Sequence, residues 1–174
     1  MFTLRCTQKL LRRGLSESEG PEQQATTMLG DWYANIIFSK PQQVVLCISE
    51  RTLLPVIVPV KGIQSLSTRV SQAVFEVLLA LGVAPEAVQK ERSNMERCRI
   101  GRTASKRVLG SLNDLLFQLE YGLHDHPERS PLEHALWLAE TPCKPIEYAS
   151  PDRATQALFF SSSVVSKARD NHAL

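Results

Sequence analysis

Six basic residues lie between positions 92 and 107 of the chain, and Glu96 is the one acidic residue among them. Such segments bind phosphate groups or acidic proteins, because guanidinium and ammonium groups neutralise the negative charge of the ligand. This interpretation requires that the arginine side chains do not already form ion pairs within the protein. The predicted residues for binding an anion or a partner are Arg99, Arg102, Lys106 and Arg107.

The same segment has a second interpretation, as the loop before a helix. It contains neither the G-x-x-x-x-G-K-[ST] order of a P-loop nor the G-x-G-x-x-G order of a dinucleotide site, so no nucleotide cofactor is indicated. Ser111 and Asp114 have the S-x-x-D spacing of a capping box, which predicts that a helix begins there. The carboxylate of Asp114 would then repel a phosphate bound at that helix end. An anion site at Arg102 and Arg107 remains the alternative.

Three carboxylates have the chemistry of acid–base groups or metal ligands, namely Asp31, Glu50 and Asp114. Asp31 and Glu50 flank two strand-like stretches at the open end of a predicted hairpin, so we expect these two residues to be neighbours. Acids at strand ends are also turn formers and surface charges, which is the alternative interpretation of this pair.

His124 and His126 form an H-x-H pair, and histidine is a common zinc ligand. A zinc site needs further ligands in fixed positions, whereas this pair precedes Pro127 in a loop-like stretch. We interpret the pair as part of a solvated loop and expect no bound metal. The four cysteines show no C-x-x-C spacing, which is typical of reduced thiols in a cytoplasmic protein.

The composition indicates one globular domain. The chain has 174 residues, of which 43% are hydrophobic, and a net charge of +2 that is too small to require nucleic acid as a partner. Because it has no apolar run of about 18 residues, we expect no membrane span. The first residues lack the apolar core of a secretory signal; their basic character also fits a mitochondrial transit peptide, which is the alternative to a folded N-terminus.

The first sixty residues have the pattern of β-structure. Residues 2–6 alternate like a strand and precede a short helix, and residues 15–27 form a polar loop that we expect to be flexible. Residues 31–38, 42–49 and 53–60 predict an antiparallel meander whose first turn is Ser39-Lys40-Pro41. Pro55 and Pro59 indicate an edge position for the last of these strands. Trp32 and Tyr33 are expected to place one ring in the core and to leave the other ring half exposed.

Helical periodicity replaces this pattern in the second half. It predicts helices over 67–81, from Pro85 towards residue 96, and over 111–123. Ser130 and Glu133 form a capping box for a helix through Trp137, and a short helix follows Ser150. The predicted fold is therefore α+β, with an antiparallel sheet of three to four strands packed against helices mostly on one face. The single domain covers residues 1–160, and residues 161–174 are a predicted disordered tail.

Five stretches of the chain together resemble an uncharacterised family of small bacterial proteins, a domain of unknown function. They are LRCTQKLL at 4–11, LGDWYANIIF at 29–38, LCISERTLLPV at 46–56, GRTASKRVLGSLND at 101–114 and LAETPC at 138–143. The resemblance covers nearly the whole chain. It implies a bacterial cytoplasmic protein, and it supplies neither an activity nor catalytic residues.

The function expected from these residues is that of a non-enzymatic binding or regulatory module. It would use the basic segment 92–107 to hold an acidic partner protein or nucleic acid. The alternative is an enzyme acting on a phosphate-bearing or nucleic-acid substrate, which would gather acids and arginines in one concave pocket. A purely structural or assembly role is also compatible with the sequence.

Overall fold

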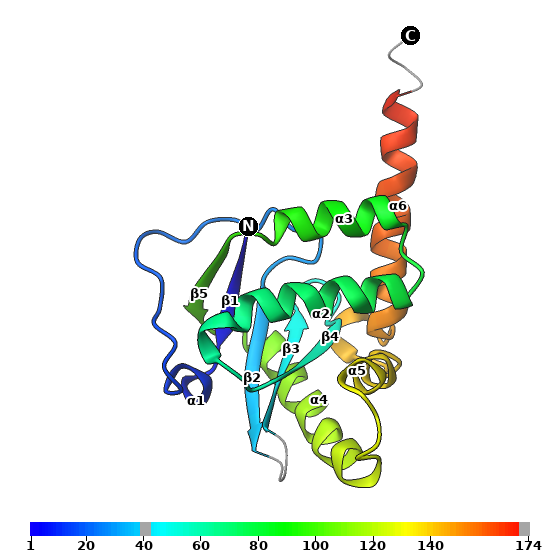
Figure 1. Cartoon of the computed structure of the whole chain (residues 1–174). Helices are drawn as coiled ribbons and strands as arrows, with labels where there is room; N and C mark the ends of the chain where they lie inside the picture. Colours follow the sequence, from blue (N-terminus) through cyan, green and yellow to red (C-terminus); the bar gives the residue numbers. More distant parts are fainter. Residues whose placement is uncertain (39–42, 171–174) are drawn as a thin grey trace.

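The computed structural model describes residues 1–38 and 43–170, with side chains up to residue 161. Five strands form one mixed sheet with the order β4-β3-β2-β1-β5 (Figure 1). The strands are β1 Phe2–Cys6, β2 Trp32–Phe38, β3 Gln43–Ser49, β4 Pro55–Pro59 and β5 Cys98–Arg102.

The predicted meander is confirmed. β2 pairs antiparallel with β3, with Trp32 opposite Ser49, and β3 pairs antiparallel with β4. β4 is an edge strand, as its two prolines require, because proline has no N–H to donate to a neighbouring strand. The predicted turn Ser39-Lys40-Pro41 lies outside the described residues.

The other half of the sheet is parallel, so the prediction of a purely antiparallel sheet of three or four strands is wrong. β1 pairs parallel with β2 on one side and with β5 on the other. β5 lies within the segment interpreted above as a basic loop. A chain segment can add to a sheet wherever a neighbouring strand offers unpaired N–H and C=O groups, and β1 offers them here.

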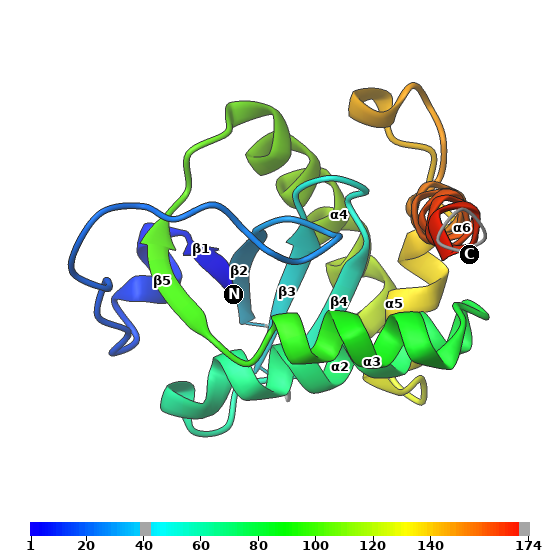
Figure 2. The same cartoon turned by 90° about the horizontal axis from the view of Figure 1, so that it is seen from above.

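Helices cover both faces of the sheet, in contrast to the prediction that they lie mostly on one face (Figure 2). α2 packs on one face with α3 against it, and α4 packs on the opposite face over β2 and β3. α5 lies beside β4 and contacts both α2 and α4. The helices are α1 Gln8–Leu11, α2 Leu66–Ala80, α3 Pro85–Asn94, α4 Lys106–Asp125, α5 Pro131–Ala139 and α6 Pro151–Asp170, with the short 3-10 turns η1 Ile63–Ser65 and η2 Lys144–Ile146.

This layering buries both aromatic rings at the start of β2. Trp32 and Tyr33 are fully buried, so the expectation that one ring is half exposed is wrong. Successive strand residues point to opposite faces, and here each face has a helix over it. The hydroxyl of Tyr33 accepts a hydrogen bond from the backbone N–H of Ser105 at 3.0 Å, just before α4 begins.

α4 begins six residues earlier than the capping box predicts. Ser105 is its N-cap, and its side chain accepts a hydrogen bond from the backbone N–H of Val108. Ser111 is buried inside the helix and Asp114 lies in its third turn, so the predicted cap at these two residues is wrong. Gly110 is tolerated in the helix interior and faces open space, because a Cβ there would meet no atom within 4 Å.

Other helix signals are confirmed. Ser130 and Glu133 form the predicted capping box at the start of α5. Gly82, with φ of +75°, follows the end of α2 in the left-handed conformation that favours glycine. α6 starts at the predicted Pro151 and is longer than the short helix expected. α6 extends to Asp170 and so runs into the stretch 161–174 that was predicted as a disordered tail. The last residues of that stretch, 171–174, lie outside the described part of the chain.

Candidate functional site

The fold distributes the basic segment over three places. Arg92 lies on α3, Arg99 and Arg102 lie on the edge strand β5, and Lys106 and Arg107 lie in the first turn of α4. The predicted binding residues therefore divide between β5 and α4, and each group has its own surroundings.

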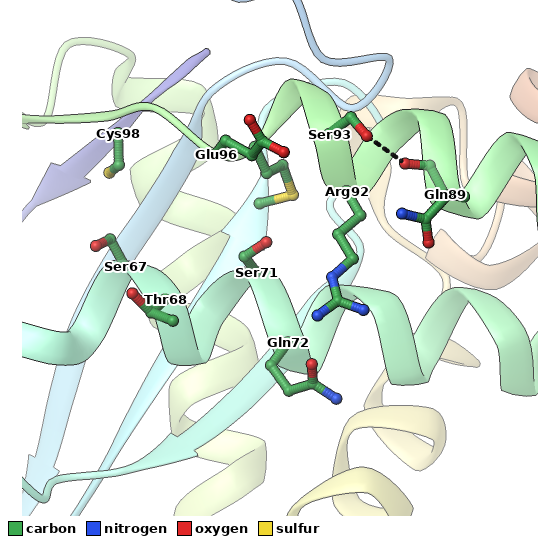
Figure 3. A pocket seen from close by; sticks show the side chains of 10 residues that line it. Ser67, Thr68, Ser71, Gln72, Gln89, Arg92, Ser93, Glu96 and Cys98 are labelled. Carbon is green, nitrogen blue, oxygen red and sulfur yellow. Dashed lines mark hydrogen bonds between the residues drawn. The ribbon is translucent and has the colours of Figure 1, made fainter.

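Arg92 points into a polar cleft between α2 and α3 with a volume of about 510 Å³ (Figure 3). Gln72 of α2 lies near the end of its side chain, and Glu96 lies on the same wall as Arg92. The guanidinium group of Arg92 is 4.9 Å from the centre of the Phe75 ring, a cation–π distance. One cation and one carboxylate line this cleft, so it carries no excess of positive charge.

Arg99 and Arg102 are engaged by the loop of residues 15–27. One terminal nitrogen of Arg99 donates to the carbonyl oxygens of Ser18, Glu19 and Gly20, at 3.3, 2.9 and 3.0 Å. Arg102 forms an ion pair with Glu17 at 2.7 Å. The acidic loop thus partly neutralises this section of the basic segment, and these two residues do not share a site with Lys106 or Arg107.

Asp31 and Glu50 are neighbours, as predicted. The backbone N–H of Glu50 donates to the carbonyl oxygen of Asp31 at 2.8 Å, and a carboxylate oxygen of Glu50 is 3.4 Å from the backbone nitrogen of Asp31. The buried Asp31 carboxylate accepts from the backbone N–H of Thr3 at 2.8 Å and from Arg5, so it holds β1 beside β2. Neither residue lies with Asp114, and the three predicted catalytic candidates are not gathered in one site.

Lys106, Arg107 and Asp114 line a cleft of about 670 Å³ on α4, which we call the α4 cleft. Its second wall is the segment 141–148, which contributes Lys144 and Tyr148. Arg107 ties the walls together, because its guanidinium group donates to the carbonyl oxygen of Pro145 at 2.9 Å. The cleft thus brings three cations and one carboxylate together at the start of a long helix.

The second wall contains an unusual backbone turn. Glu147 and Tyr148 have φ of 57° and 61°, in the left-handed region that costs a non-glycine residue about 1–3 kcal/mol. The turn is closed by hydrogen bonds from the backbone N–H of Tyr148 to the carbonyl oxygen of Cys143 and from that of Cys143 to Ala149, both at 3.0 Å. It leaves the Tyr148 side chain at the rim of the cleft, where the residue is 67% exposed.

A buried thiol lies at the base of this cleft. Burial raises the pKa of Cys143, and the nearby carboxylate of Asp114 raises it further. The thiol is therefore protonated at neutral pH and is a poor nucleophile. The cleft supplies positive charge and an aromatic ring rather than an activated nucleophile.

The histidine pair lies at the exposed end of α4, where His124 is in the last turn of the helix and His126 is its C-cap, so the interpretation of the pair as part of a loop is wrong for His124. His124 and His126 are both exposed, and the Nδ1 atom of His126 is 3.2 Å from a carboxylate oxygen of Glu128. Among the side chains that the structure describes, those of residues 1–38 and 43–161, no group of three or more His, Cys, Asp or Glu is arranged to hold a metal ion.

Two residues of the α4 cleft, Lys144 and Tyr148, are absent from the predicted site. No spacing in the sequence connects them to Lys106 and Arg107, since a whole helix, α5, separates the two walls along the chain. The only local signal is the Lys144-Pro145 pair, which is typical of an exposed turn.

Among curated proteins, none matches the chain. Among the helices that the structure describes, none combines the length and apolar character needed to cross a membrane. The model of one family, the domain of unknown function DUF6933, matches residues 3–154, which include all five stretches of the resemblance noted above. That match covers most of the chain, and the protein therefore belongs to the DUF6933 family.

Proposed function

We propose that the protein is a non-enzymatic binding module whose α4 cleft holds a phosphate-bearing ligand, single-stranded nucleic acid. The observation that carries the proposal is that Lys106, Arg107 and Lys144 line one cleft although they come from two separate segments. Asp114 is the one carboxylate among the residues that line it, so the cleft has an excess of positive charge. Phosphate groups are the ligands that such a cluster attracts most strongly.

The aromatic side chains beside the cleft favour a single strand over a duplex or free phosphate. Tyr148 lies at the rim of the cleft. Phe117 and Tyr121 lie on α4 and are 74% and 64% exposed. Gly110, Asp114, Phe117 and Tyr121 are three or four residues apart, so they follow one stripe of α4. A base that is not paired stacks on such rings, and each stacked base contributes about 1–3 kcal/mol.

Asp114 favours a second candidate function, that of an enzyme acting on a phosphate-bearing substrate. It is the one predicted catalytic residue that shares a cleft with predicted phosphate-binding residues, Lys106 and Arg107. The two candidate functions give the Asp114 carboxylate different roles, so they predict different effects of substituting it. In a binding module it repels phosphate, whereas in an enzyme it takes part in the reaction.

The test is a fluorescence-anisotropy titration with labelled oligo-dT and with a labelled duplex, at about 50 mM and about 200 mM salt. The double variant Lys106→Gln/Lys144→Gln removes two cations from the cleft and leaves the bond from Arg107 to Pro145 intact. The matched control is Lys61→Gln/Lys90→Gln, which removes two exposed lysines that do not line the α4 cleft.

We expect the wild type to bind oligo-dT in a salt-sensitive manner and the cleft variant to bind at least about tenfold more weakly, with a salt slope reduced by about one per lost phosphate contact. The control should bind like the wild type. Absence of binding by the wild type, or equal losses in both variants, would contradict the proposal.

Asp114→Asn separates the two candidate functions. In a binding module this substitution strengthens binding of oligo-dT, because it removes a negative charge next to the phosphates. If the protein is an enzyme, the wild type instead converts the oligonucleotide and the Asp114→Asn variant does not. Gel electrophoresis of the labelled strand after incubation measures this conversion.

A further inference from the structure

Residues 15–22 form an acidic strap along the outer edge of the sheet. The strap contains Glu17, Glu19 and Glu22, and there is no lysine or arginine between positions 15 and 27. After α1 the chain runs around the outer side of β5, the edge strand, before it returns to β2 (Figure 2). The strap therefore occupies the place where a further strand would join the sheet.

The strap meets the backbone of β5 at Ile100. The backbone N–H of Ser18 donates to the carbonyl oxygen of Ile100, and the N–H of Ile100 donates to the Ser18 side-chain oxygen, both at 2.9 Å. Among the described residues, these are the backbone groups of β5 that the strap pairs with. One residue of an edge strand is thus paired, where an added strand would pair along its length.

Three guanidinium groups hold the strap in place. Arg99 donates to three consecutive carbonyl oxygens of the strap, from Ser18 to Gly20. Arg102 pairs with the Glu17 carboxylate at 2.7 Å and Arg5 pairs with that of Glu22 at 3.0 Å. The edge therefore presents backbone pairing groups together with cations that contact both the backbone and the carboxylates of an acidic segment.

The strap is held by contacts that water competes with. Residues 16–24 are all exposed, and the Glu22 side chain keeps 78% of its surface. Exposed ion pairs contribute little stability, and after Leu15, which packs against the core, the strap adds almost no apolar burial of its own. A segment with these properties opens locally at a low free-energy cost.

We propose that the acidic strap is a displaceable occupant of the β5 edge, and that this edge docks an extended acidic segment of a partner protein. The partner would add to β5 as a strand, accepting from the N–H of Ile100 and donating to its carbonyl oxygen. Its carboxylates would replace those of Glu17 and Glu22 at Arg102 and Arg5. This docking is independent of the α4 cleft, because none of these residues lines that cleft.

The chemistry of the edge favours a polypeptide over nucleic acid. The carbonyl oxygen of Ile100 accepts a hydrogen bond, and the sugar–phosphate backbone of DNA has no donor to supply it. Arg99 donates to backbone carbonyl oxygens of the strap, so the acceptors it binds here are those of a polypeptide rather than phosphate oxygens. The acidic strap itself shows the kind of sequence that fits.

The test compares the wild type with the variant Glu17→Gln/Ser18→Ala/Glu22→Gln, which weakens the strap in the full-length chain. The probe is a fluorescein-labelled peptide with the sequence of residues 15–24, LSESEGPEQQ. Loss of the competing strap, which acts at a high effective concentration, should let the variant bind the peptide at least about tenfold more tightly than the wild type does. Adding Arg99→Gln to the variant should abolish that gain.

Hydrogen exchange at the Ile100 amide supplies a second readout. We expect this amide to exchange faster in the variant than in the wild type, and to regain protection when the peptide is added. The control probes are the same peptide with its three glutamates replaced by glutamine and an unlabelled oligo-dT competitor. The glutamine peptide should bind more weakly than the acidic peptide. The oligo-dT should not displace the acidic peptide.

Three outcomes would overturn the proposal. If Ile100 exchanges equally slowly in the variant and the wild type, the strap is not displaceable. If Ile100 is exposed in the variant and the acidic peptide still does not bind, the edge is not a docking site. If oligo-dT displaces the peptide from the variant, the edge recognises phosphate rather than an acidic polypeptide.

Discussion

Arg5 of β1 and Asp31, the residue before β2, form a buried ion pair, with a guanidinium nitrogen 2.9 Å from a carboxylate oxygen. Their side chains are 10% and 7% exposed. Asp31 also accepts from the backbone of Thr3, and Arg5 reaches out to Glu22 of the acidic strap. The pair therefore joins the sheet interior to the loop that crosses its edge.

Replacing Asp31 by asparagine should be strongly destabilising. The substitution leaves the Arg5 guanidinium buried without its internal counter-charge, and removing one partner of a buried pair costs about 3–5 kcal/mol. The free energy of unfolding from urea titration measures this loss. Glu22→Gln is the control, because it removes the exposed partner of the same arginine and should cost less than about 1 kcal/mol. Equal losses in the two variants would mean that the inner pair is not the dominant one.

Two glycines of α4 should respond in opposite ways to alanine. Gly110→Ala places a Cβ in open space within a helix, where the change from glycine to alanine stabilises by about 1 kcal/mol. Gly122→Ala places a Cβ 2.8 Å from a ring carbon of Trp137, which forces the ring to move. Overpacking of this kind costs about 1–3 kcal/mol. Thermal unfolding followed by circular dichroism should rank Gly110→Ala above the wild type and Gly122→Ala below the wild type.

His134 should make the protein less stable in mild acid. The residue is buried on α5, and neither ring nitrogen has a hydrogen-bond partner among the described residues. Burial lowers the pKa of its imidazole, and the charge of Arg129 lowers it further. The unfolded chain therefore takes up this proton at a higher pH than the folded one, so the contribution to stability is present above about pH 6.5 and is lost below it.

The measurement is the free energy of unfolding of the wild type and of His134→Leu across this pH range. The difference between the two proteins isolates this residue from other titrating groups. The wild type should lose stability relative to the variant as the pH falls from neutral towards 5. A constant difference would show that the imidazole is neutral or charged alike in both states.

The cysteines should react slowly in the folded protein. Burial raises the pKa of both Cys6 and Cys98 to about 12, so almost no thiolate is present at neutral pH. Alkylation by iodoacetamide, followed by mass spectrometry, should therefore be slow in buffer and fast in urea, where all four thiols are accessible. Rapid labelling of the partly exposed Cys98 in the native protein would contradict this expectation.

The elements with local signals were predictable from the sequence. Alternation and the two prolines identify the meander of β2, β3 and β4, and the capping box of Ser130 and Glu133 identifies the start of α5. Each of these signals arises from residues that are close together in the chain. The same holds for the adjacency of Asp31 and Glu50, because a hairpin brings its two ends together.

β5 was not predictable in this way. Its sequence, CRIGR, is short and basic, and arginine is an ordinary loop residue. It becomes a strand because β1 provides a parallel neighbour, and because the acidic strap provides carbonyl acceptors for Arg99 and a carboxylate for Arg102. Both partners lie far away along the chain, so no local pattern reports them.

The α4 cleft shows the same division between local and distant contributions. Lys106 and Arg107 were identified from their own segment, whereas Lys144 and Tyr148 approach them only after α5 has turned the chain back. The start of α4 was misplaced because two serines compete as caps. Tertiary contact decides between them, since the N–H of Ser105 is bound by the buried hydroxyl of Tyr33.

The position of β1 in the sheet has a consequence for how the chain folds. The strand nearest the N-terminus lies between β2 and β5, and Phe2 pairs with Cys98. Contacts between residues so distant in sequence slow folding, because a long loop must close before they form. We therefore expect the β2–β3–β4 meander to assemble first, and the parallel half of the sheet to be completed only once β5 has reached its place.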